Sequence, residues 1–282
     1  MRTQIKNIPI ISGIIQSNYS INHIIFQLLK TIMILMSGVY YLSLMDAFAW
    51  YRMPRYEDET NIILPDIGYI IIPYNCPLES PQNMQTYILK MSILFSMVCA
   101  ISSKNGLFVI QRCIHLTSIA CILKGTVGCL TSYPNPNPVC SSLLKDKQTL
   151  LEILKRVMGT MPTHSCGNLM FSGHASLLTL LFLVEGKYDK IHNANAIWYS
   201  KLLFIRIIKT VMGYYSIIAC RSHYTSDVVI GIMLASLIFI VSETHFATSK
   251  ILSSIEMRSY KKIVYKNECV DDIRSLSVFE QL

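Results

Sequence analysis

The sequence predicts an all-α integral membrane protein with six transmembrane helices. Hydrophobic residues make up 52% of the 282 residues and charged residues only 15%, whereas soluble domains carry about 25% charged residues. Six apolar runs have close to, or more than, the roughly 20 residues that a helix needs to cross a bilayer. The remaining chain forms loops and short ends, so we expect one membrane domain and no second domain of any size.

The six apolar runs divide the chain into a membrane domain and two ends. They cover residues 24–49, 86–102, 106–132, 169–185, 197–220 and 226–247. We expect an N-terminal segment at 1–23, a six-span domain at 24–249 and a basic tail at 250–282. Three basic residues interrupt the second and third runs: Lys90, Arg112 and Lys124. Because a charge within the bilayer needs a polar environment, these residues predict a polar interior.

The distribution of basic residues predicts the orientation of the spans. Outside the spans, and counting Lys201 near the start of the fifth run, twelve Lys and Arg residues lie on the side of the two termini and seven on the other side. Cytosolic loops carry the excess of positive charge, so we expect both termini in the cytosol. The loop at 133–168 and the segment Cys220–Thr225 then face the lumen or the cell exterior. The sequence leaves the organelle open between Golgi, plasma membrane and endoplasmic reticulum.

The nine cysteines form neither a C-x-x-C pair nor a Cys/His cluster at zinc spacing, so we predict no metal site. Four of them lie in apolar runs, where a free cysteine behaves as a small hydrophobic residue: Cys99, Cys113, Cys121 and Cys129. Three lie in loops and could form a disulfide in an oxidising compartment: Cys76, Cys140 and Cys166. We expect a bond between Cys140 and Cys166, with two free thiols as the alternative. No basic run is interleaved with aromatic residues, so nucleic acid is not an expected partner.

Two short motifs at the mouths of the fourth and sixth spans carry the expected chemistry. Ser172-Gly173-His174 opens the fourth span, and His223 stands four residues before Asp227 at the sixth. In a helix this spacing places the imidazole and the carboxylate on a common side. Asp227 can then hold the ring tautomer and leave the other nitrogen as a nucleophile. His174 can protonate a departing oxygen or accept a proton from an incoming alcohol.

Phosphoryl transfer requires mainly positioning and charge stabilisation, and the same motifs offer donors for phosphate oxygens. The candidates are Ser172, Gly173, the backbone amides near His174, and Arg221. Each motif alone has an ordinary interpretation, because a single histidine at a helix mouth usually caps or packs and a His/Asp pair is usually a surface pair. Their combination at one membrane face indicates catalysis. The remaining histidines lack such partners and are expected to be structural or interfacial: His23, His115, His164, His192 and His245.

At these residues the sequence resembles the sphingomyelin synthase family, within the phosphatidic-acid phosphatase type 2 (PAP2) superfamily. The stretch CGNLMFSGHASLLTL is similar to the family's CGD-x-x-x-SGHT segment, and HYTSDVVIG is similar to its HYT-x-DVVIA segment. The LPD tripeptide that ends at Asp66 matches a family element, which brings Asp66 into the expected substrate site. Arg112 and Lys124 match a further family region more loosely. The resemblance covers roughly residues 60–235.

The resemblance implies that His223 is the nucleophile, that Asp227 assists it, and that His174 acts as acid and base. The implied reaction moves phosphocholine from phosphatidylcholine to ceramide and gives sphingomyelin and diacylglycerol, with no metal and no other cofactor. The expected partners are therefore these membrane lipids, and self-association stays open. Transfer of an ethanolamine or inositol head group, and hydrolysis by a lipid phosphate phosphatase, are alternatives. A non-catalytic protein that binds ceramide or moves lipids is the alternative of a different class, which the complete His/His/Asp set disfavours.

Several residues depart from the family pattern. Asn168 replaces the aspartate of CGD, which removes a negative charge near the site and leaves the head group open. Ala175, Gly231 and Lys124 replace the usual Thr, Ala and Arg. The Lys-x6-Arg-Pro element of the phosphatases is not evident, and Ile217 stands where their Ser-Arg motif has arginine. These differences favour transfer over hydrolysis.

Overall fold

A computed structural model describes residues 21–52, 64–76, 81–101, 106–131, 134–136, 149–152, 155, 169–192 and 196–245. These residues are helical or irregular, and no strand occurs among them, which agrees with the all-α prediction. The chain divides into two units, residues 1–239 and 240–282. The second unit is described only at 240–245, where the last helix continues. The predicted tail at 250–282 and nearly all of the N-terminal segment lie outside the described residues.

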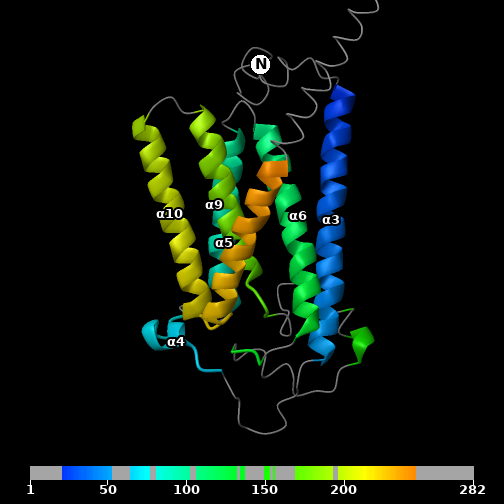
Figure 1. The fold of residues 1–282 in the computed structure, drawn as a ribbon, viewed down its shortest axis with the longest axis vertical. Coiled ribbons are helices and arrows are strands. Elements are labelled where there is room, and N and C mark those ends of the chain that lie inside the picture. Colours follow the sequence, from blue (N-terminus) through cyan, green and yellow to red (C-terminus); the bar gives the residue numbers. More distant parts are fainter. Residues whose placement is uncertain are drawn as a thin grey trace, which may run out of the picture. The chain divides into compact units, whose positions relative to one another are not determined.

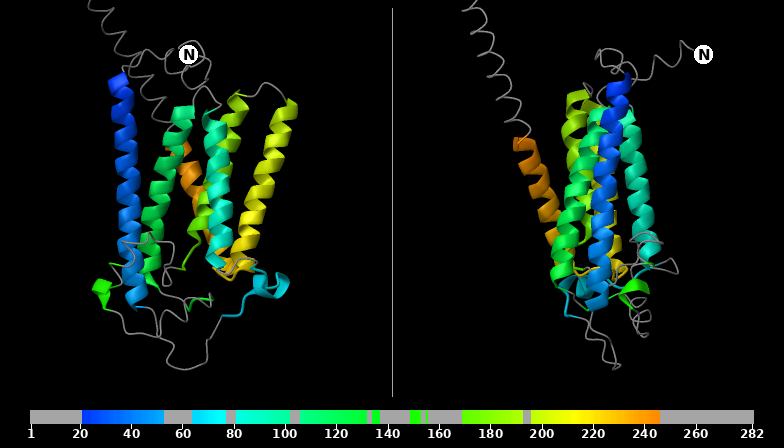
Figure 2. Two further views of the ribbon diagram at one scale, coloured as in Figure 1. Left: turned by 180° about the vertical axis from the view of Figure 1, so that it is seen from behind. Right: turned by 90° about the vertical axis from the view of Figure 1, so that its right-hand side faces the viewer.

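Six long helices in the described part of the chain follow the six predicted spans. They are α3 (Ile21–Arg52), α5 (Pro81–Ile101), α6 (Gly106–Leu130), α9 (Gly173–His192), α10 (Ala196–Ala219) and a last helix, Thr225–His245. Figures 1 and 2 show α3, α5, α6, α9 and α10 running side by side. All of the six except α9 are long and apolar enough to cross a membrane. These five helices make the chain a multi-pass membrane protein. The predicted span that corresponds to α9 stays a prediction.

The helix α9 differs from its predicted range at both ends. It begins at Gly173 because the Ser172 hydroxyl accepts the Ala175 N–H at 3.2 Å, which is the hydrogen bond of an N-cap serine. The four residues before it, predicted as part of the span, are not helical. The helix continues past residue 185 as far as His192. Its second half carries Glu185 and further charged residues, which is why its composition departs from that of the other five helices.

Small residues bring α3 and α6 close together. A Cβ atom added to Gly38 of α3 would lie 3.1 Å from the Ser118 carbonyl oxygen of α6. One added to Gly125 of α6 would lie 3.3 Å from the Leu42 Cα atom of α3. Such close backbone approach is the usual way in which helices associate within a bilayer.

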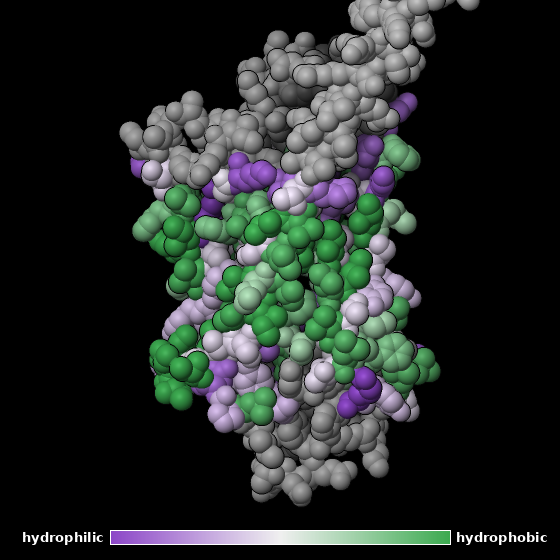
Figure 3. Space-filling view, in the orientation of Figure 1, coloured by the Kyte–Doolittle hydropathy of each residue, from purple (hydrophilic) through white to green (hydrophobic). Residues whose placement is uncertain are grey.

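Helices α6 and α9 share an apolar core with the last helix. Leu116 of α6, Leu180 and Val184 of α9, and Ala235 of the last helix are buried against one another. Many of the large apolar residues point outward instead, and Figure 3 shows them as a broad apolar band over the helices. An outward apolar surface around helices of this length is what a lipid environment requires.

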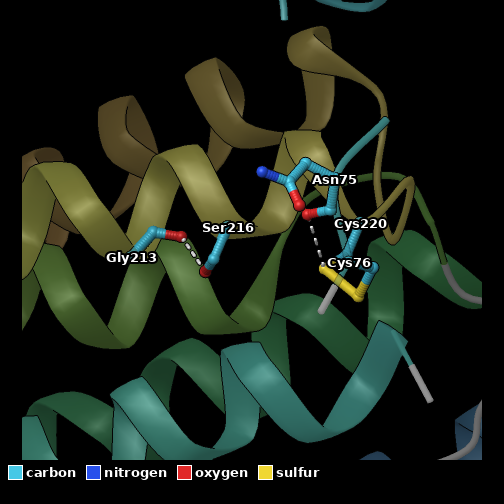
Figure 4. The surroundings of a disulfide bond; sticks show 5 residues. All are labelled: Asn75, Cys76, Gly213, Ser216 and Cys220. Carbon is cyan, nitrogen blue, oxygen red and sulfur yellow. Dashed lines mark hydrogen bonds between the residues drawn. A yellow bond between two sulfur atoms is a disulfide. The ribbon is translucent and has the colours of Figure 1, made fainter. Parts of the chain in front are cut away.

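The short helix α4 (Ile67–Ile71) lies at the end of the bundle where α10 ends and the last helix begins (Figure 1). Just beyond it, Cys76 forms a disulfide with Cys220, with Cα atoms 5.0 Å apart (Figure 4). The sequence marked Cys76 as a disulfide candidate but not Cys220, which ends an apolar run. The expected partners Cys140 and Cys166 lie outside the described residues. The four cysteines that were expected to be free are free thiols, as predicted: Cys99, Cys113, Cys121 and Cys129.

Candidate active site

A tight turn between α10 and the last helix carries the first catalytic candidates. At the end of α10 the Arg221 N–H donates to the Ile218 carbonyl and the Ser222 N–H to the Ile217 carbonyl. This pair of bonds is a Schellman motif, in which the residue at the Arg221 position adopts a left-handed conformation and is usually glycine. Arg221 has φ 53°, at a cost of about 1 kcal/mol. The side chain of Arg221 must therefore provide something that glycine does not.

Asp227 caps the last helix and faces His223 with the same oxygen. Its Oδ2 accepts the Tyr224 N–H at 3.0 Å, as the third residue of a helix does in a capping box. The same Oδ2 lies 3.5 Å from His223 Nδ1. His223 stands outside the helix, which begins at Thr225, so the pairing results from the cap and not from helical spacing. Because the Asp227 carboxylate lies beside Nδ1, Nε2 is the ring nitrogen that can attack a phosphorus atom.

Burial sets the electrostatics of this pair. His223 is only 8% exposed and Asp227 3%. Burial, the largest effect, lowers the pKa of His223 below its ordinary value, and Lys124 acts in the same direction. Asp227 and the Leu169 backbone oppose this shift without cancelling it. The imidazole is therefore neutral at physiological pH, which is the state that a nucleophilic nitrogen needs.

The first turn of α9 brings His174 to the same place. The Ser172 N–H donates to the Asp227 carbonyl at 2.9 Å, which joins the start of α9 to the start of the last helix. A Cβ atom at Gly231 would lie 2.8 Å from the Ser172 carbonyl oxygen, so glycine permits this approach where the family has alanine. Gly173 and His174 are half-buried rather than closed off. Their position at a helix N-terminus favours an anion such as a phosphate group.

Lys124 is a site residue that sequence reasoning did not include among its candidates. It reaches from α6 to donate to the Phe171 carbonyl at 2.7 Å, and its side chain packs against Gly173, where a Cβ atom would lie 3.0 Å from Lys124 Cδ. Its positive charge repels a proton on His174 or His223 and attracts the Asp227 carboxylate. The sequence feature that could have identified Lys124 as a site residue is its positive charge inside an apolar run.

Asp66 and Arg221 were both expected to bind substrate. In the structure, their hydrogen bonds connect α4 to the turn between α10 and the last helix. Asp66 Oδ2 accepts the Thr225 N–H at 2.7 Å, and its Oδ1 caps α4 by accepting the Gly68 N–H at 2.8 Å. Arg221 Nη2 donates to the Tyr69 and Ile72 carbonyls at 3.1 and 3.2 Å. The Arg221 guanidinium also stacks on the Tyr69 ring at 3.9 Å. These contacts give both residues a positioning role.

Comparison with known proteins finds a family that part of this chain resembles. Residues 165–244 match the family model described as the C-terminal region of the PAP2 superfamily. The match contains His174, His223 and Asp227, whereas Asp66 and Lys124 lie before it and complete its surroundings from α4 and α6.

Several curated relatives of this chain are ceramide phosphotransferases. A phosphatidylethanolamine:ceramide ethanolaminephosphotransferase of Trypanosoma brucei brucei is 31% identical over 60% of this chain and 49% of its own length. A phosphatidylinositol:ceramide inositolphosphotransferase of Trypanosoma cruzi is 30% identical over 44% of this chain and 35% of its own. The human phosphatidylcholine:ceramide cholinephosphotransferase 1 is 29% identical over 39% of this chain and 29% of its own length. The chain thus spans half or less of each of these relatives, and the predicted resemblance to the sphingomyelin synthase family is confirmed.

Some of the hydrogen-bonding groups near His174 and His223 already have partners within the protein, whereas others do not have them within their helix. The Ser172 side chain caps α9, while the first N–H groups of that helix have no partner within it. His174, in contrast, is half-buried at the open end. Among the described residues, no group of three His, Cys, Asp or Glu side chains could hold a metal ion. The arrangement offers a nucleophilic nitrogen, a proton carrier and a positively charged environment for a phosphate.

Proposed function

We propose that this chain transfers the phospho-head group of a glycerophospholipid to ceramide. The observation that carries the proposal is the buried His223–Asp227 pair, with 3.5 Å between Nδ1 and Oδ2, beside His174 at the N-terminus of α9. A neutral nucleophile and a proton carrier at a helix N-terminus match the needs of phosphoryl chemistry. The ceramide phosphotransferases among the relatives support the same substrate class.

The two half-reactions use the same residues in turn. First, His223 Nε2 bonds to phosphorus while the bond from phosphorus to the diacylglycerol oxygen breaks, and His174 gives that oxygen its proton. Then the primary hydroxyl of ceramide attacks the phosphohistidine, His174 accepts the hydroxyl proton, and the bond between phosphorus and nitrogen breaks. The charge of Asp227 stabilises the imidazolium in both steps. The enzyme should therefore follow ping-pong kinetics, with diacylglycerol released before ceramide reacts.

Phosphocholine is the head group that the family resemblance leads us to propose, so that the product is sphingomyelin. Phosphoethanolamine is the second candidate, because two ethanolaminephosphotransferases of Trypanosoma brucei are 31% and 33% identical to this chain and the human choline enzyme is 29% identical. Asn168, in place of the aspartate of the family motif, lies outside the described residues, and its effect on the choice of head group stays open.

The decisive experiment is a cell-free assay of the expressed protein in vesicles. Fluorescent ceramide is supplied with phosphatidylcholine, phosphatidylethanolamine or phosphatidylinositol in turn, and the products are separated by chromatography. A ceramide product with one donor establishes the transferase and its head group. Continuous release of diacylglycerol without ceramide, beyond the single turnover that forms the phosphohistidine, would establish a phospholipid hydrolase instead. An inert protein, in a preparation where the human choline enzyme is active, would favour a lipid-binding role.

We further propose that both termini are cytosolic and that the site faces the lumen or cell exterior. The excess of basic residues on the terminus side supports this orientation, as does the Cys76–Cys220 disulfide beside the site, since disulfides persist in oxidising compartments. An epitope tag after Leu282 should require membrane permeabilisation for detection in intact cells. A tag inserted near residue 147 should be protected from protease in sealed microsomes, and detection of both tags on one side would refute the orientation.

A further inference from the structure

The outward side of α4 consists of isoleucines. Ile67, Ile70 and Ile71 are 68%, 83% and 71% exposed, and their spacing of three and four residues places them on one side of the helix. No charged residue occurs between Asp66 and Cys76. In Figure 3 a cluster of apolar residues stands at the place where Figure 1 draws α4. An exposed aliphatic group of this kind indicates contact with an apolar partner.

The inward side of α4 is fixed to the catalytic turn. Gly68 lies so close to the Thr225 side chain that a Cβ atom would not fit. The Tyr69 hydroxyl donates to the His223 carbonyl at 3.0 Å, and the Arg221 guanidinium holds two carbonyls of the α4 segment. The isoleucines therefore cannot turn inward unless these contacts break. Any displacement of α4 is transmitted directly to the backbone of His223.

The position of α4 along the spans is set by the end of α10. The 24 residues of α10 extend about 36 Å, and the hydrocarbon core of a bilayer is about 30 Å thick, so the end of α10 lies at the bilayer interface. The Asn75 N–H donates to the Ala219 carbonyl, the last of α10, at 3.2 Å. The segment that carries α4 is thus attached at the level of the interface. Short amphipathic helices lie in the membrane plane at this level.

We propose that the face formed by Ile67, Ile70 and Ile71 inserts into the lipid surface at the boundary between head groups and acyl chains. This insertion holds the His223–Asp227 turn at the depth of the lipid phosphates. Tyr74, which is exposed just beyond the helix, is of a residue type enriched at that boundary. The partner is the bilayer in which the spans themselves lie.

A second copy of the chain fits this face less well than lipid does. Stable protein interfaces use about 20–30 residues from each partner, whereas α4 offers three outward side chains on five residues. A lipid surface needs no matching partner surface, because it accepts any aliphatic group at the correct depth.

Tryptophan fluorescence tests the insertion without reference to catalysis. Three variants are compared in phosphatidylcholine vesicles after subtraction of the emission of the parent protein: Ile70→Trp, Met233→Trp and Glu152→Trp. Met233 is 66% exposed within the last helix and serves as the lipid standard. Glu152 is a fully exposed carboxylate and serves as the water standard. The quenchers are lipids brominated near the head group and, in separate samples, iodide on both sides of the membrane.

We expect brominated lipid to quench the added emission of Ile70→Trp as it quenches Met233→Trp, and iodide to quench only Glu152→Trp strongly. Iodide quenching of Ile70→Trp equal to that of Glu152→Trp would place the face in water and overturn the proposal. Protection from both quenchers would place it against protein, such as a second copy, and would overturn the proposal as well.

A second measurement, which rests on the proposed transferase function, tests the coupling to His223. Ile70→Glu should lower head-group transfer from long-chain lipids in vesicles at least tenfold while transfer to a water-soluble short-chain ceramide in detergent stays near that of the parent. Ile70→Leu keeps an aliphatic side chain and should behave as the parent in both assays. Equal loss in vesicles and detergent would overturn the coupling, because it would indicate damage to the site. If the parent transfers no head group in either assay, the proposed function fails while the fluorescence result still decides the insertion.

Discussion

Two groups of ionisable side chains lie among these helices, and they are constructed differently. Glu185 of α9 forms a closed group with α10, because its Oε1 lies 2.6 Å from Lys209 Nζ and its Oε2 lies 3.2 Å from Arg206 Nε. Ser96 of α5 also bonds to this carboxylate, and Arg206 is fully buried. At the catalytic end, His174 is half-buried and the closest approach of His223 to Asp227 is 3.5 Å.

The difference shows that a charge within the spans does not by itself mark an active site. The Glu185 group joins three helices through ion pairs and a hydrogen bond between their own side chains, so it helps to explain how α5, α9 and α10 stay together. The catalytic group leaves His174 accessible at a helix N-terminus, where a phosphate can complete the arrangement. Access to a ligand, more than depth in the membrane, separates the two roles.

The largest expected effect is the loss of the nucleophile. His223→Ala should abolish formation of the phosphohistidine and release of diacylglycerol, because it removes the nitrogen that is proposed to attack phosphorus. The matched control is His115→Ala in α6, away from the site, which should leave more than half of the activity. The measurement is the initial rate of transfer in vesicles at equal amounts of folded protein. Equal loss in both variants would indicate damage to the fold and would remove the catalytic assignment.

Asp227→Asn should lower the rate by about 10³–10⁴-fold, as loss of the orienting carboxylate does in serine-protease triads. Its pH dependence provides a second readout. The pKa of His223 is held below 6.5 by burial, so the acidic side of the rate profile should rise with pH through a midpoint below 6.5. At higher pH the rate should fall again, because the proton that His174 donates is lost. Because Asp227 opposes the effect of burial on His223, its replacement should move the acidic midpoint to still lower pH. An unchanged midpoint would show that the two side chains are not coupled.

His174→Ala should be about 10²–10⁴-fold slower with natural donors, which is the usual contribution of a general acid. A p-nitrophenyl ester of phosphocholine has a leaving group that needs no proton, so it should restore the first step in this variant. The same ester should not restore His223→Ala, which lacks the nucleophile. The measurement is p-nitrophenol release in a single turnover, and rescue of His223→Ala alone would reverse the two roles.

Glu185→Gln should affect stability and leave chemistry nearly unchanged. Removing one member of a buried charge group costs about 3–5 kcal/mol, because Arg206 and Lys209 would lose their counter-charge. The matched control is Lys187→Gln, on the same helix but exposed, with an expected cost of about 1 kcal/mol or less. Thermal unfolding in detergent measures both. A large loss of turnover in folded Glu185→Gln would assign this group a functional role after all.

The parts of the molecule that the sequence predicted correctly are those set by local rules. Five of the six long helices follow from apolar length, because the bilayer requires about 20 such residues wherever a chain crosses it. The placement of His174 and His223 at one end follows from motifs at helix mouths and from the number of crossings between them. The free thiols of the apolar runs follow from their surroundings alone.

The parts that the sequence did not predict depend on contacts between distant segments. The Cys76–Cys220 bond and the Asp66–Thr225 contact each join residues about 150 positions apart, and no periodicity encodes such a pairing. Helix α4 has five residues, too few for a pattern to be recognised. The role of Lys124 required the fold that brings α6 beneath Gly173.

Cys76 is synthesised long before its partner, because 144 residues separate it from Cys220. At about 5–20 residues per second of translation, the thiol waits roughly 7–30 s before a disulfide can form. The attachment points of α4 at Ala219 and Thr225 emerge in the same late interval. The candidate active site of the nascent protein is thus incomplete until nearly all of its described helices exist, and a ribosome that stalls before Cys220 leaves a reduced Cys76 accessible to other thiols.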